Sequence, residues 1–363
     1  MSLLTDVGEA SWAGKNVFVT GVCGTIGSEL LRRLRMLDVA RIVGIDIDEG
    51  ALFELIGKLG EDHRVELVLC DIRSLESLAR IMRGSDIVIH AAAYKHVGIC
   101  EQAPNEAVST NITGTQNVIS AAFQNNVERV LLTSTDKAVN PTNVMGTSKL
   151  MAERLITAAS ANSRGARPIF SSIRFGNVVG SNGSVVPLFA GQIAAGGPVT
   201  LTDNEMTRFV MSLDQAVGLV MSATFLARGG EVMVTKMPVM RIADLATSMI
   251  QYLAPRHGYE PARIPIRIIG SRPGEKMFEE LTNSEEVRRT FEWQNFLVVK
   301  PPFSGRGVNI FDDWERQGTP LREPYNSALL PAMPSTDVRA YFESEELGSR
   351  NGVADAVGSA ACA

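Results

Sequence analysis

One stretch near the N-terminus decides the expected fold: Asn16-Val17-Phe18-Val19-Thr20-Gly21-Val22-Cys23-Gly24-Thr25-Ile26-Gly27. The apolar run at residues 16–20 predicts a buried strand, and the glycines that follow have the spacing GxxGxxG. Glycines at this spacing allow a tight turn, a close approach of backbone to a pyrophosphate, and close packing of the next helix. That helix, expected over residues 28–37, points free N–H groups and the positive end of its dipole at the anion. The alternative is a glycine-rich turn that serves folding alone.

The first half of the chain alternates short apolar runs with longer amphipathic ones. Further strands are expected at residues 41–46, 65–70, 87–90 and 129–133, and further helices at 51–59, 75–82 and 111–124. Strands that alternate with helices indicate parallel pairing through right-handed crossovers. The pattern therefore predicts an α/β fold with a doubly wound parallel sheet. We expect this Rossmann domain over residues 1–175, with some later segments returning to it.

The pattern changes after residue 175, where glycine and proline become denser and the predicted helices shorter. We expect residues 176–345 to form a smaller lobe that binds substrate. Residues 199–201 and 231–234 are expected to be strands of this lobe, and residues 241–253 one of its helices. The last residues are mainly glycine, alanine and serine, so we expect a disordered tail over 346–363.

The composition excludes several classes of protein. The chain has 363 residues, is 45% hydrophobic and carries a formal net charge of −5, which argues against nucleic acid or an anionic membrane surface as partner. Its four cysteines and four histidines are dispersed, which predicts free thiols and no metal site. Without a signal peptide or an apolar run of about 20 residues, we expect a cytoplasmic protein.

Two carboxylates follow predicted strands and bear on the cofactor. Asp46 ends the second strand, where a carboxylate can accept hydrogen bonds from the adenosine ribose hydroxyls. It would repel a 2′-phosphate, so it favours NAD over NADP, and Arg41 lies too early in the strand to hold that phosphate. Asp71 and Ile72 end the third strand, where such folds contact adenine. The alternative for Asp46 is a cap on the segment that follows it.

Residues 133–149 resemble the active-site stretch of the extended short-chain dehydrogenase/reductase family. That family places a tyrosine and a lysine at the spacing YxxxK, with a serine or threonine nearby. Lys149 matches the lysine, but Met145 occupies the tyrosine position, and a thioether cannot relay a proton.

Within that family the chain resembles the bacterial UDP-N-acetylglucosamine 4,6-dehydratases, several of which also carry methionine at the tyrosine position. The resemblance spans roughly residues 14–286. It rests on GVCGTIGSEL (residues 21–30), HAAAYKHV (90–97), STDKAVNPTNVMGTSK (134–149), RFGNVVGSNGSV (174–185), MTRF (206–209) and RPGEK (272–276). One departure lies at residues 98–100, where a proline is expected after the valine.

The resemblance implies a reaction in which NAD⁺ takes a hydride from C4 of the sugar, water is lost across C5 and C6, and the hydride returns to C6. It implies that Asp136 is the acid at the C6 oxygen and Lys137 the base at C5, while Thr135 bonds the C4 oxygen. A lysine base must be neutral, which requires a lowered pKa. The C4 proton leaves through Thr135, Asp136 or a water. The alternative is that residues 135–137 form a polar turn that caps a helix.

The resemblance also assigns binding roles. Met145 and Lys149 complete the catalytic set. The residues expected to bind the cofactor are Gly21, Gly24, Thr25, Ile26, Gly27, Asp46, Asp71, Ile72, Ala91 and Lys149. The residues expected to bind the substrate are Lys95, His96, Asn177, Arg208, Arg272 and Glu275. Arginine suits a diphosphate because its planar donors bind in pairs. For His96 and its neighbour Tyr94, a structural role is an equal alternative.

We therefore expect an NAD-dependent enzyme that dehydrates a UDP-sugar, with UDP-N-acetylglucosamine as substrate, and that forms a homo-oligomer as members of this family commonly do. Three alternatives stay open. The first is another reaction of the same family, such as 4-epimerisation or 5,6-dehydration. The second is a dehydratase that also inverts C5. The third is a dinucleotide-binding regulator without catalysis.

Overall fold

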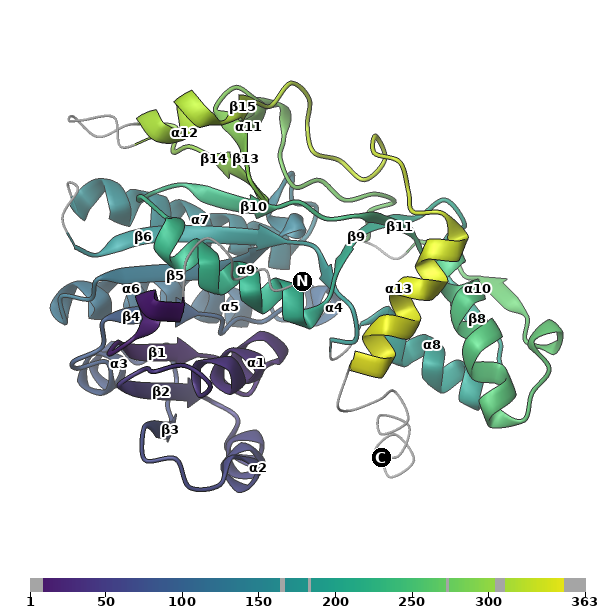
Figure 1. Ribbon diagram of the computed structural model, residues 1–363, viewed down its shortest axis with the longest axis horizontal. Helices are drawn as coiled ribbons and strands as arrows, with labels where there is room; N and C mark the ends of the chain where they lie inside the picture. Colours follow the sequence, from purple (N-terminus) through teal and green to yellow (C-terminus); the bar gives the residue numbers. More distant parts are fainter. Residues whose placement is uncertain (1–8, 164–166, 182–183, 272–273, 304–310, 349–363) are drawn as a thin grey trace. The chain divides into compact units, whose positions relative to one another are not determined.

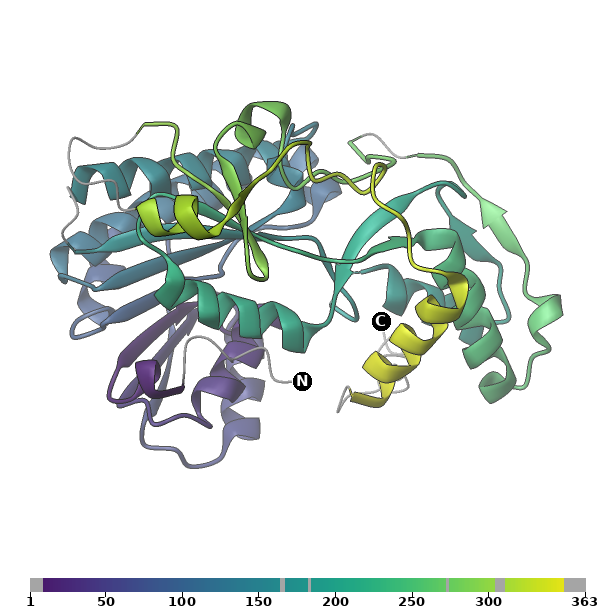
Figure 2. The same cartoon turned by 45° about the horizontal axis from the view of Figure 1, so that its top comes forward.

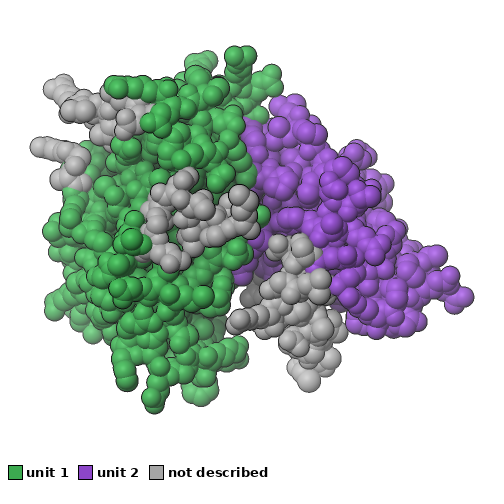
Figure 3. Space-filling model, viewed as in Figure 1, with its two compact units in different colours: residues 1–175, 214–236, 281–324 green, residues 176–213, 237–280, 325–363 purple. Residues whose placement is uncertain are grey.

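The computed structural model describes residues 9–163, 167–181, 184–271, 274–303 and 311–348. The chain divides into two compact units, each built from three segments (Figure 3). The first unit contains residues 1–175, 214–236 and 281–324, and the second contains residues 176–213, 237–280 and 325–363. Each unit is described by itself below.

A single ten-stranded sheet forms the centre of the first unit (Figure 1). Its strands are β1 (Asn16–Thr20), β2 (Arg41–Asp46), β3 (Val65–Leu69), β4 (Ile87–His90), β5 (Arg129–Thr135), β6 (Ile169–Phe175), β10 (Val232–Thr235), β13 (Thr290–Trp293), β14 (Phe296–Val299) and β15 (Thr319–Pro320). The order is β15-β13-β14-β10-β6-β5-β4-β1-β2-β3. The run from β3 to β10 is parallel, and β14, β13 and β15 continue it antiparallel.

The strand order confirms the predicted doubly wound fold. From β3 to β6 it reads 3-2-1-4-5-6, so the direction of winding reverses between β1 and β4. In open parallel sheets of this kind, ligands bind outside the carboxyl ends of the strands at that reversal. A ligand site is therefore expected at the segments after β1 and β4, with the segment after the neighbouring β5 beside them.

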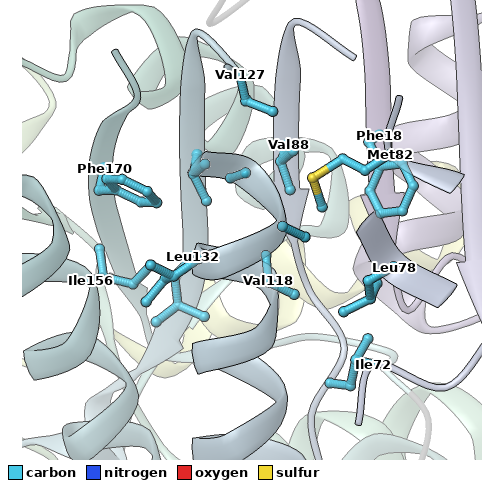
Figure 4. Packing of buried hydrophobic residues seen from close by; sticks show 14 of the residues in the cluster. Phe18, Ile72, Leu78, Met82, Val88, Val118, Val127, Leu132, Ile156 and Phe170 are labelled. Carbon is cyan, nitrogen blue, oxygen red and sulfur yellow. The ribbon is translucent and has the colours of Figure 1, made fainter. Parts of the chain in front are cut away.

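Helices cover both faces of this sheet (Figure 2). They are η1 (Glu9–Trp12), α1 (Thr25–Leu34), α2 (Glu49–Leu59), α3 (Leu75–Ile81), α4 (Val97–Gln102), α5 (Pro104–Ala107), the π-helical η2 (Val108–Thr113), α6 (Gly114–Gln124), η3 (Asp136–Ala138), α7 (Val144–Ser163), α9 (Leu213–Leu226), α11 (Ser284–Val287) and α12 (Asp312–Gln317). On one face, α3, α6 and α7 bury Leu78, Val118 and Ile156 against strand residues such as Phe18 and Phe170 (Figure 4).

The second unit has two small sheets and its own core. Its elements are β7 (Asn177–Val178), α8 (Val185–Ala194), β8 (Val199–Leu201), β9 (Thr207–Met211), β11 (Val239–Arg241), α10 (Ile242–Leu253), η4 (Ala254–His257), η5 (Pro261–Arg263), β12 (Ile266–Ile268) and α13 (Ser335–Gly348). Strands β11, β9 and β7 form one sheet, and β12 pairs with β8 in the other. Phe189, Met249 and Phe342 belong to the core that α8, α10 and α13 share.

Residues 231–234 do not form a strand of the smaller lobe, contrary to the expectation. Strand β10 covers Val232–Thr235 and lies in the large sheet, parallel to β6 and antiparallel to β14. All four of its residues are buried, so it fits the centre of a covered sheet rather than a small edge sheet.

Two other boundaries differ from the expectation. The segment expected as one helix over residues 111–124 begins as the π-helical turn η2, in which the Asn111 carbonyl accepts a bond from the Thr115 hydroxyl. Helix α13 continues to Gly348, so it includes the first residues of the expected tail, and residues 349–363 lie outside the described part. No helix among the described residues is long and apolar enough to cross a bilayer.

Candidate active site

The glycine loop after β1 is shaped by close backbone contacts. Gly21 has a φ of +70°, and the N–H groups of Gly21 and Val22 both donate to the Ile45 carbonyl of β2. A Cβ on Gly27 would lie 2.1 Å from the Gly21 carbonyl oxygen, so only glycine lets α1 start directly against the loop. Gly24, the N-cap residue, offers no side-chain acceptor. The first N–H groups of α1, from Thr25, Ile26 and Gly27, thus have no capping partner and suit an anion.

Asp46 ties the end of β2 to the glycine loop. Its Oδ2 accepts from the Cys23 N–H at 2.9 Å, and its Oδ1 accepts from the N–H groups of Ile47 and Asp48. The cap of helix α2 is Asp48, whose side chain accepts from the Ala51 N–H at 3.0 Å. Asp46 therefore caps the segment that follows it, at Ile47 and Asp48, and the same carboxylate also holds the glycine loop.

Other candidates for cofactor binding lie at the same edge. Asp71 pairs with Arg73 through its carboxylate, and Ile72 is buried against Gly114 of α6. Ala91 directly follows β4, and its N–H donates to Thr20 of β1. These residues follow β3 and β4, two strands of the parallel part of the sheet.

The segment Thr135-Asp136-Lys137 forms a hydrogen-bonded triplet at the carboxyl end of β5. The Thr135 hydroxyl donates to Asp136 Oδ1 at 2.7 Å, and Lys137 Nζ lies 3.2 and 3.1 Å from the two carboxylate oxygens. The Asp136 side chain is 3% exposed and that of Lys137 is 33% exposed, so the ammonium end is the more accessible part. An acid and a base are thus held side by side on a short 3₁₀ turn, η3.

Helix α7 packs against this triplet through a glycine. A Cβ on Gly146 would lie 2.2 Å from the Lys137 carbonyl oxygen, so the helix touches the backbone of the turn. The neighbouring Met145 is 2% exposed and packs with Cys100 and Ala107 in a small apolar cluster. In the family that this stretch resembles, this position usually holds a tyrosine. Here an apolar packing side chain occupies it.

Lys149 lies one helical turn further along α7. Its Nζ donates to the Thr133 carbonyl of β5 at 2.8 Å, and the residue is 8% exposed. Burial lowers the pKa of Lys149 to about 8, and the negative charge of Glu153 acts in the opposite direction. The ammonium has further N–H donors available beyond the bond to Thr133.

A buried chain of polar groups, which sequence analysis missed, crosses the first unit beside this site. Thr115 uses its hydroxyl hydrogen to donate to the Asn111 carbonyl, so it must accept from His90 Nε2, 3.1 Å away. His90 Nδ1 is then the acceptor for the Thr20 hydroxyl at 2.7 Å. Burial lowers the pKa of His90 to about 3, with a smaller effect of Lys149 in the same direction. The ring is therefore neutral and carries its hydrogen on Nε2.

Asn111 extends this chain to the segment after β4. Its side chain accepts from the Tyr94 N–H and donates to the Tyr94 carbonyl, and it also donates to the Ser148 hydroxyl on α7. Tyr94, Lys95 and His96 are themselves exposed. The spacing of Asn111 and Thr115, four residues apart on one helix face, was the available signal for this network.

The substrate candidates of the second unit gather around a carboxylate that sequence analysis also missed. Glu279 is 3% exposed and accepts from Asn177 Nδ2 at 3.0 Å and from the Phe209 N–H at 3.1 Å. Arg208 Nε lies 3.3 Å from Glu279, and its other nitrogens donate to backbone carbonyls, including that of Lys276.

The remaining substrate candidates are placed less fully. The Thr202 hydroxyl donates to Glu275 at 3.4 Å. Arg272 lies outside the described residues. The cofactor and catalytic candidates thus belong to the first unit, while Asn177, Arg208 and Glu275 belong to the second.

Comparison with known proteins places the chain in a family. A family model described as polysaccharide biosynthesis protein matches residues 17–301. This chain belongs to the polysaccharide biosynthesis protein family. The resemblance drawn from its motifs is confirmed at this level, because the family model covers most of the chain and a UDP-N-acetylglucosamine 4,6-dehydratase is similar to it.

Curated relatives of this polysaccharide biosynthesis protein carry different activities in their names. The UDP-N-acetylglucosamine 4,6-dehydratase (inverting) of Campylobacter jejuni is 39% identical over 79% of this chain and 83% of its own. The UDP-glucose 4-epimerase of Rickettsia akari is 37% identical over 86% of this chain and 91% of its own. The capsular polysaccharide biosynthesis protein CapD of Staphylococcus aureus is 42% identical over 75% of this chain, but the match spans only 46% of CapD.

Several solved structures share the fold of this chain. The structure of Pen from Bacillus thuringiensis is 36% identical, with a TM-score of 0.83 over 92% of this chain and 98% of Pen. The dTDP-glucose 4,6-dehydratase DesIV from Streptomyces venezuelae, solved with NAD, is 22% identical, with a TM-score of 0.63 over 85% of this chain and 100% of DesIV. Epimerase structures with NAD are similar at the same level, which shows the fold alone.

The neutral His90 makes a prediction about acid stability. A buried histidine whose pKa is lowered from 6.5 to about 3 binds a proton in the unfolded chain but not in the folded one. The free energy of unfolding of this polysaccharide biosynthesis protein should therefore fall with pH below about 6.5, by up to about 1.4 kcal/mol per pH unit from this residue, until about pH 3. Urea unfolding at several pH values gives the free energy of unfolding as a function of pH. The slope of this free energy against pH should be shallower for His90→Gln than for the wild type. The same replacement at the exposed His63 should leave the slope unchanged; equal slopes for all three proteins would contradict the assignment.

Proposed function

We propose that this chain is an NAD-dependent UDP-sugar 4,6-dehydratase with UDP-N-acetylglucosamine as its substrate. The observation that carries the proposal is the Thr135-Asp136-Lys137 triplet. It holds an acid and a base together at the carboxyl end of β5, at the same edge of the parallel sheet as the glycine loop after β1. The named activity of the Campylobacter jejuni relative supports the same reaction.

The residues of the glycine loop fit a dinucleotide. The space that a Cβ would fill at Gly27 is occupied by the loop backbone, and the first N–H groups of α1 have no capping side chain, as a pyrophosphate site requires. Asp46 stands at the end of β2 for the adenosine ribose, and Lys149 on α7 offers donors for the nicotinamide ribose. When bound, NAD would supply the redox chemistry, accepting a hydride from C4 of the sugar and returning it at C6.

The triplet can supply both proton transfers of the elimination. As described, Lys137 and Asp136 are paired at 3.1 Å, which suits an ammonium and a carboxylate. Turnover requires this pair with one proton fewer: a neutral Lys137 amine as the base at C5, beside an Asp136 carboxyl that has received the C4 hydroxyl proton and is the acid at C6. The amine then takes the C5 proton, the acid protonates the C6 hydroxyl, and water leaves. The pair is then an ammonium and a carboxylate. The ammonium reprotonates C5 after the hydride has reached C6, which restores the neutral amine and the carboxylate for the next turnover.

The proton of the C4 hydroxyl needs a different route from the usual tyrosine, because Met145 cannot carry it. We assign this step to Thr135, whose hydroxyl donates to Asp136 at 2.7 Å. A proton lost from the C4 oxygen can pass through this hydroxyl to the carboxylate. Because the same carboxylate later serves C6, oxidation and elimination would share one acid.

The nucleotide end of the substrate would be bound by the second unit. Asn177 and Arg208 are held by Glu279, so their side chains are oriented before a ligand binds. Arg272 and Glu275 are proposed to contact the diphosphate and the ribose. The 4-epimerase activity named for the Rickettsia relatives is the competing function, since an epimerase needs hydride transfer at C4 but no acid at C6. Incubating the protein with UDP-N-acetylglucosamine and UDP-glucose, and identifying the products by NMR, separates a 4-keto-6-deoxy product from an epimer.

Cofactor choice should depend on the charge of Asp46. Asp46→Asn keeps an acceptor for the Cys23 N–H but removes the charge, so it should narrow the preference for NAD over NADP at little cost to NAD affinity. Asp46→Ala should also loosen the loop and weaken NAD binding, since hydrogen bonds to a charged group contribute about 1.5–3 kcal/mol. Titration calorimetry with both cofactors checks this; unchanged affinities in Asp46→Ala would show that the ribose lies elsewhere.

The contact of α7 with the triplet should be essential for turnover. Gly146→Ala places a Cβ where the Lys137 carbonyl lies, so the turn must shift, and a displacement of about 1 Å can cost about 10²-fold in rate. Gly57→Ala, in helix α2 with nothing within 4 Å of the new Cβ, is the matched control. It should leave turnover unchanged and stabilise the helix by up to about 1 kcal/mol. Dehydratase assays and thermal unfolding distinguish the two; a fully active Gly146→Ala enzyme would contradict the contact.

Isotopes should report separate fates for two hydrogens of the substrate. The C5 hydrogen leaves as a proton, so product formed in deuterated water should carry deuterium at C5. The C4 hydrogen leaves as hydride, so substrate deuterated at C4 should give product labelled at C6. Lys137→Ala and Asp136→Asn should each lower turnover by about 10²–10⁴-fold while NAD still binds. Met145→Ala, which alters only apolar packing, should be far milder. Loss of the C4 label to solvent would rule out this mechanism.

A further inference from the structure

A second set of charged groups lies buried behind the catalytic helix. Arg174, at the end of β6, is 1% exposed and binds two carboxylates that are both 2% exposed. Its Nε and Nη2 donate to Glu153 of α7 at 2.8 and 2.6 Å, and Nη1 and Nη2 donate to Glu286 of α11 at 2.9 Å each. Nη1 also donates to the Leu281 carbonyl at 3.1 Å. The guanidinium therefore fixes both carboxylates through paired hydrogen bonds.

The formal charges of this triad do not balance. One guanidinium faces two carboxylates, which leaves a net charge of −1 in a place that water does not reach. Burial raises the pKa of Glu286, but Arg174 outweighs this and holds that pKa below its usual value. Arg289 lies 4.0 Å from Glu286, but it is paired with Glu285 at 3.0 Å, so these two charges offset each other.

The missing positive charge is supplied by Lys149. Lys149 and Glu153 are four residues apart on α7, so their side chains lie on the same face of the helix. Both are buried, and the ammonium together with the triad gives a formal charge of zero. Because Arg174 holds both oxygens of Glu153, the position of this carboxylate relative to Lys149 is fixed.

We propose that Glu153, clamped by Arg174, is a positioning residue that keeps Lys149 in its ammonium form for the cofactor ribose. The proposal rests on the function proposed above in so far as Lys149 binds the cofactor. Glu153 itself touches neither the cofactor nor the substrate in this assignment, and acts only through Lys149.

The other charged or titratable groups around Lys149 do not supply the negative charge that favours its ammonium form. His90 of β4 is neutral, and Asp136 and Lys137 of η3 offset each other. Glu101 of α4 accepts from the Val144 N–H at the first residue of α7. Burial lowers the pKa of Lys149 to about 8, and Glu153 is the group that opposes this shift. Removing the charge of Glu153 should therefore move the titration of Lys149 well below pH 8.

Two variants with matched effects on Arg174 test the proposal. Glu153→Gln and Glu286→Gln each replace one buried carboxylate partner of Arg174 by an amide of the same shape, so both should lower stability. Only Glu153→Gln removes a charge next to Lys149. The titration of Lys149 is followed by NMR of the full-length protein with ¹³C-labelled lysine side chains, and its signal is assigned by its absence in Lys149→Met.

We expect Glu153→Gln to lower the titration midpoint of Lys149 by at least one pH unit, a tenfold change in proton affinity. Glu286→Gln should move it by less than a third of that. The affinity for NAD should fall more steeply between pH 6.5 and 8.5 in Glu153→Gln than in the wild type. Equal shifts in both variants, or no shift in either, would overturn the proposal and leave the triad a purely structural feature.

A second variant covers the case in which Glu153→Gln does not fold. Replacing a buried ion triad by apolar residues of similar volume is often neutral or stabilising. The triple variant Glu153→Met, Arg174→Met, Glu286→Leu should therefore fold and still show the lowered midpoint, and an unchanged midpoint would overturn the proposal. The titration of Lys149 needs no substrate, so the test of Glu153 remains valid if the enzyme proves to be an epimerase. A wild-type protein that binds no NAD would instead contradict the proposed function.

Discussion

The hydrogen bond from Lys149 Nζ to the Thr133 carbonyl fixes helix α7 against the central sheet, and much of the site depends on it. With helix α7 in this position, Gly146 packs against the backbone of Lys137, so the helix supports the triplet after β5. One turn further on, Glu153 reaches Arg174 of β6. A single buried ammonium thus sets the register between helix α7 and strand β5, which leads directly into the turn that carries the acid and the base.

The sequence predicted the parts of this arrangement that depend on local pattern. The glycine loop, the alternation of strands and helices, and the position of Lys149 follow from spacing over a few residues. The buried networks do not, because Arg174 and Glu286 are 112 residues apart and His90 and Thr115 are 25 apart. Strand β10 was assigned to the wrong unit for a similar reason, since an apolar run of four residues carries no information on which sheet it joins. The bond from the Cys23 N–H to Asp46 could not be predicted either, because it joins the end of β2 to the loop after β1.

The methionine at position 145 and the triplet after β5 are chemically related, because a proton that Met145 cannot carry has to pass through the triplet. An apolar side chain packed with Cys100 and Ala107 leaves no titratable group at that point of the helix. In the proposed reaction, proton transfer would then be carried by a threonine, an aspartate and a lysine that already share hydrogen bonds. A compact relay of this kind favours chemistry that needs several proton transfers in sequence at neighbouring atoms.

The three-segment construction of the first unit has a consequence for the growing chain on the ribosome. Strand β6 is made early, but its neighbour β10 comes only after the first segment of the second unit, so the edge of β6 stays unpaired in the meantime. Arg174 gains its second carboxylate partner later still, because Glu286 belongs to the last segment of the unit. Until that segment emerges, the guanidinium has only one of its two carboxylates. The nascent sheet therefore ends at β6 until β10 has emerged, and its charged core is complete only once Glu286 has emerged as well.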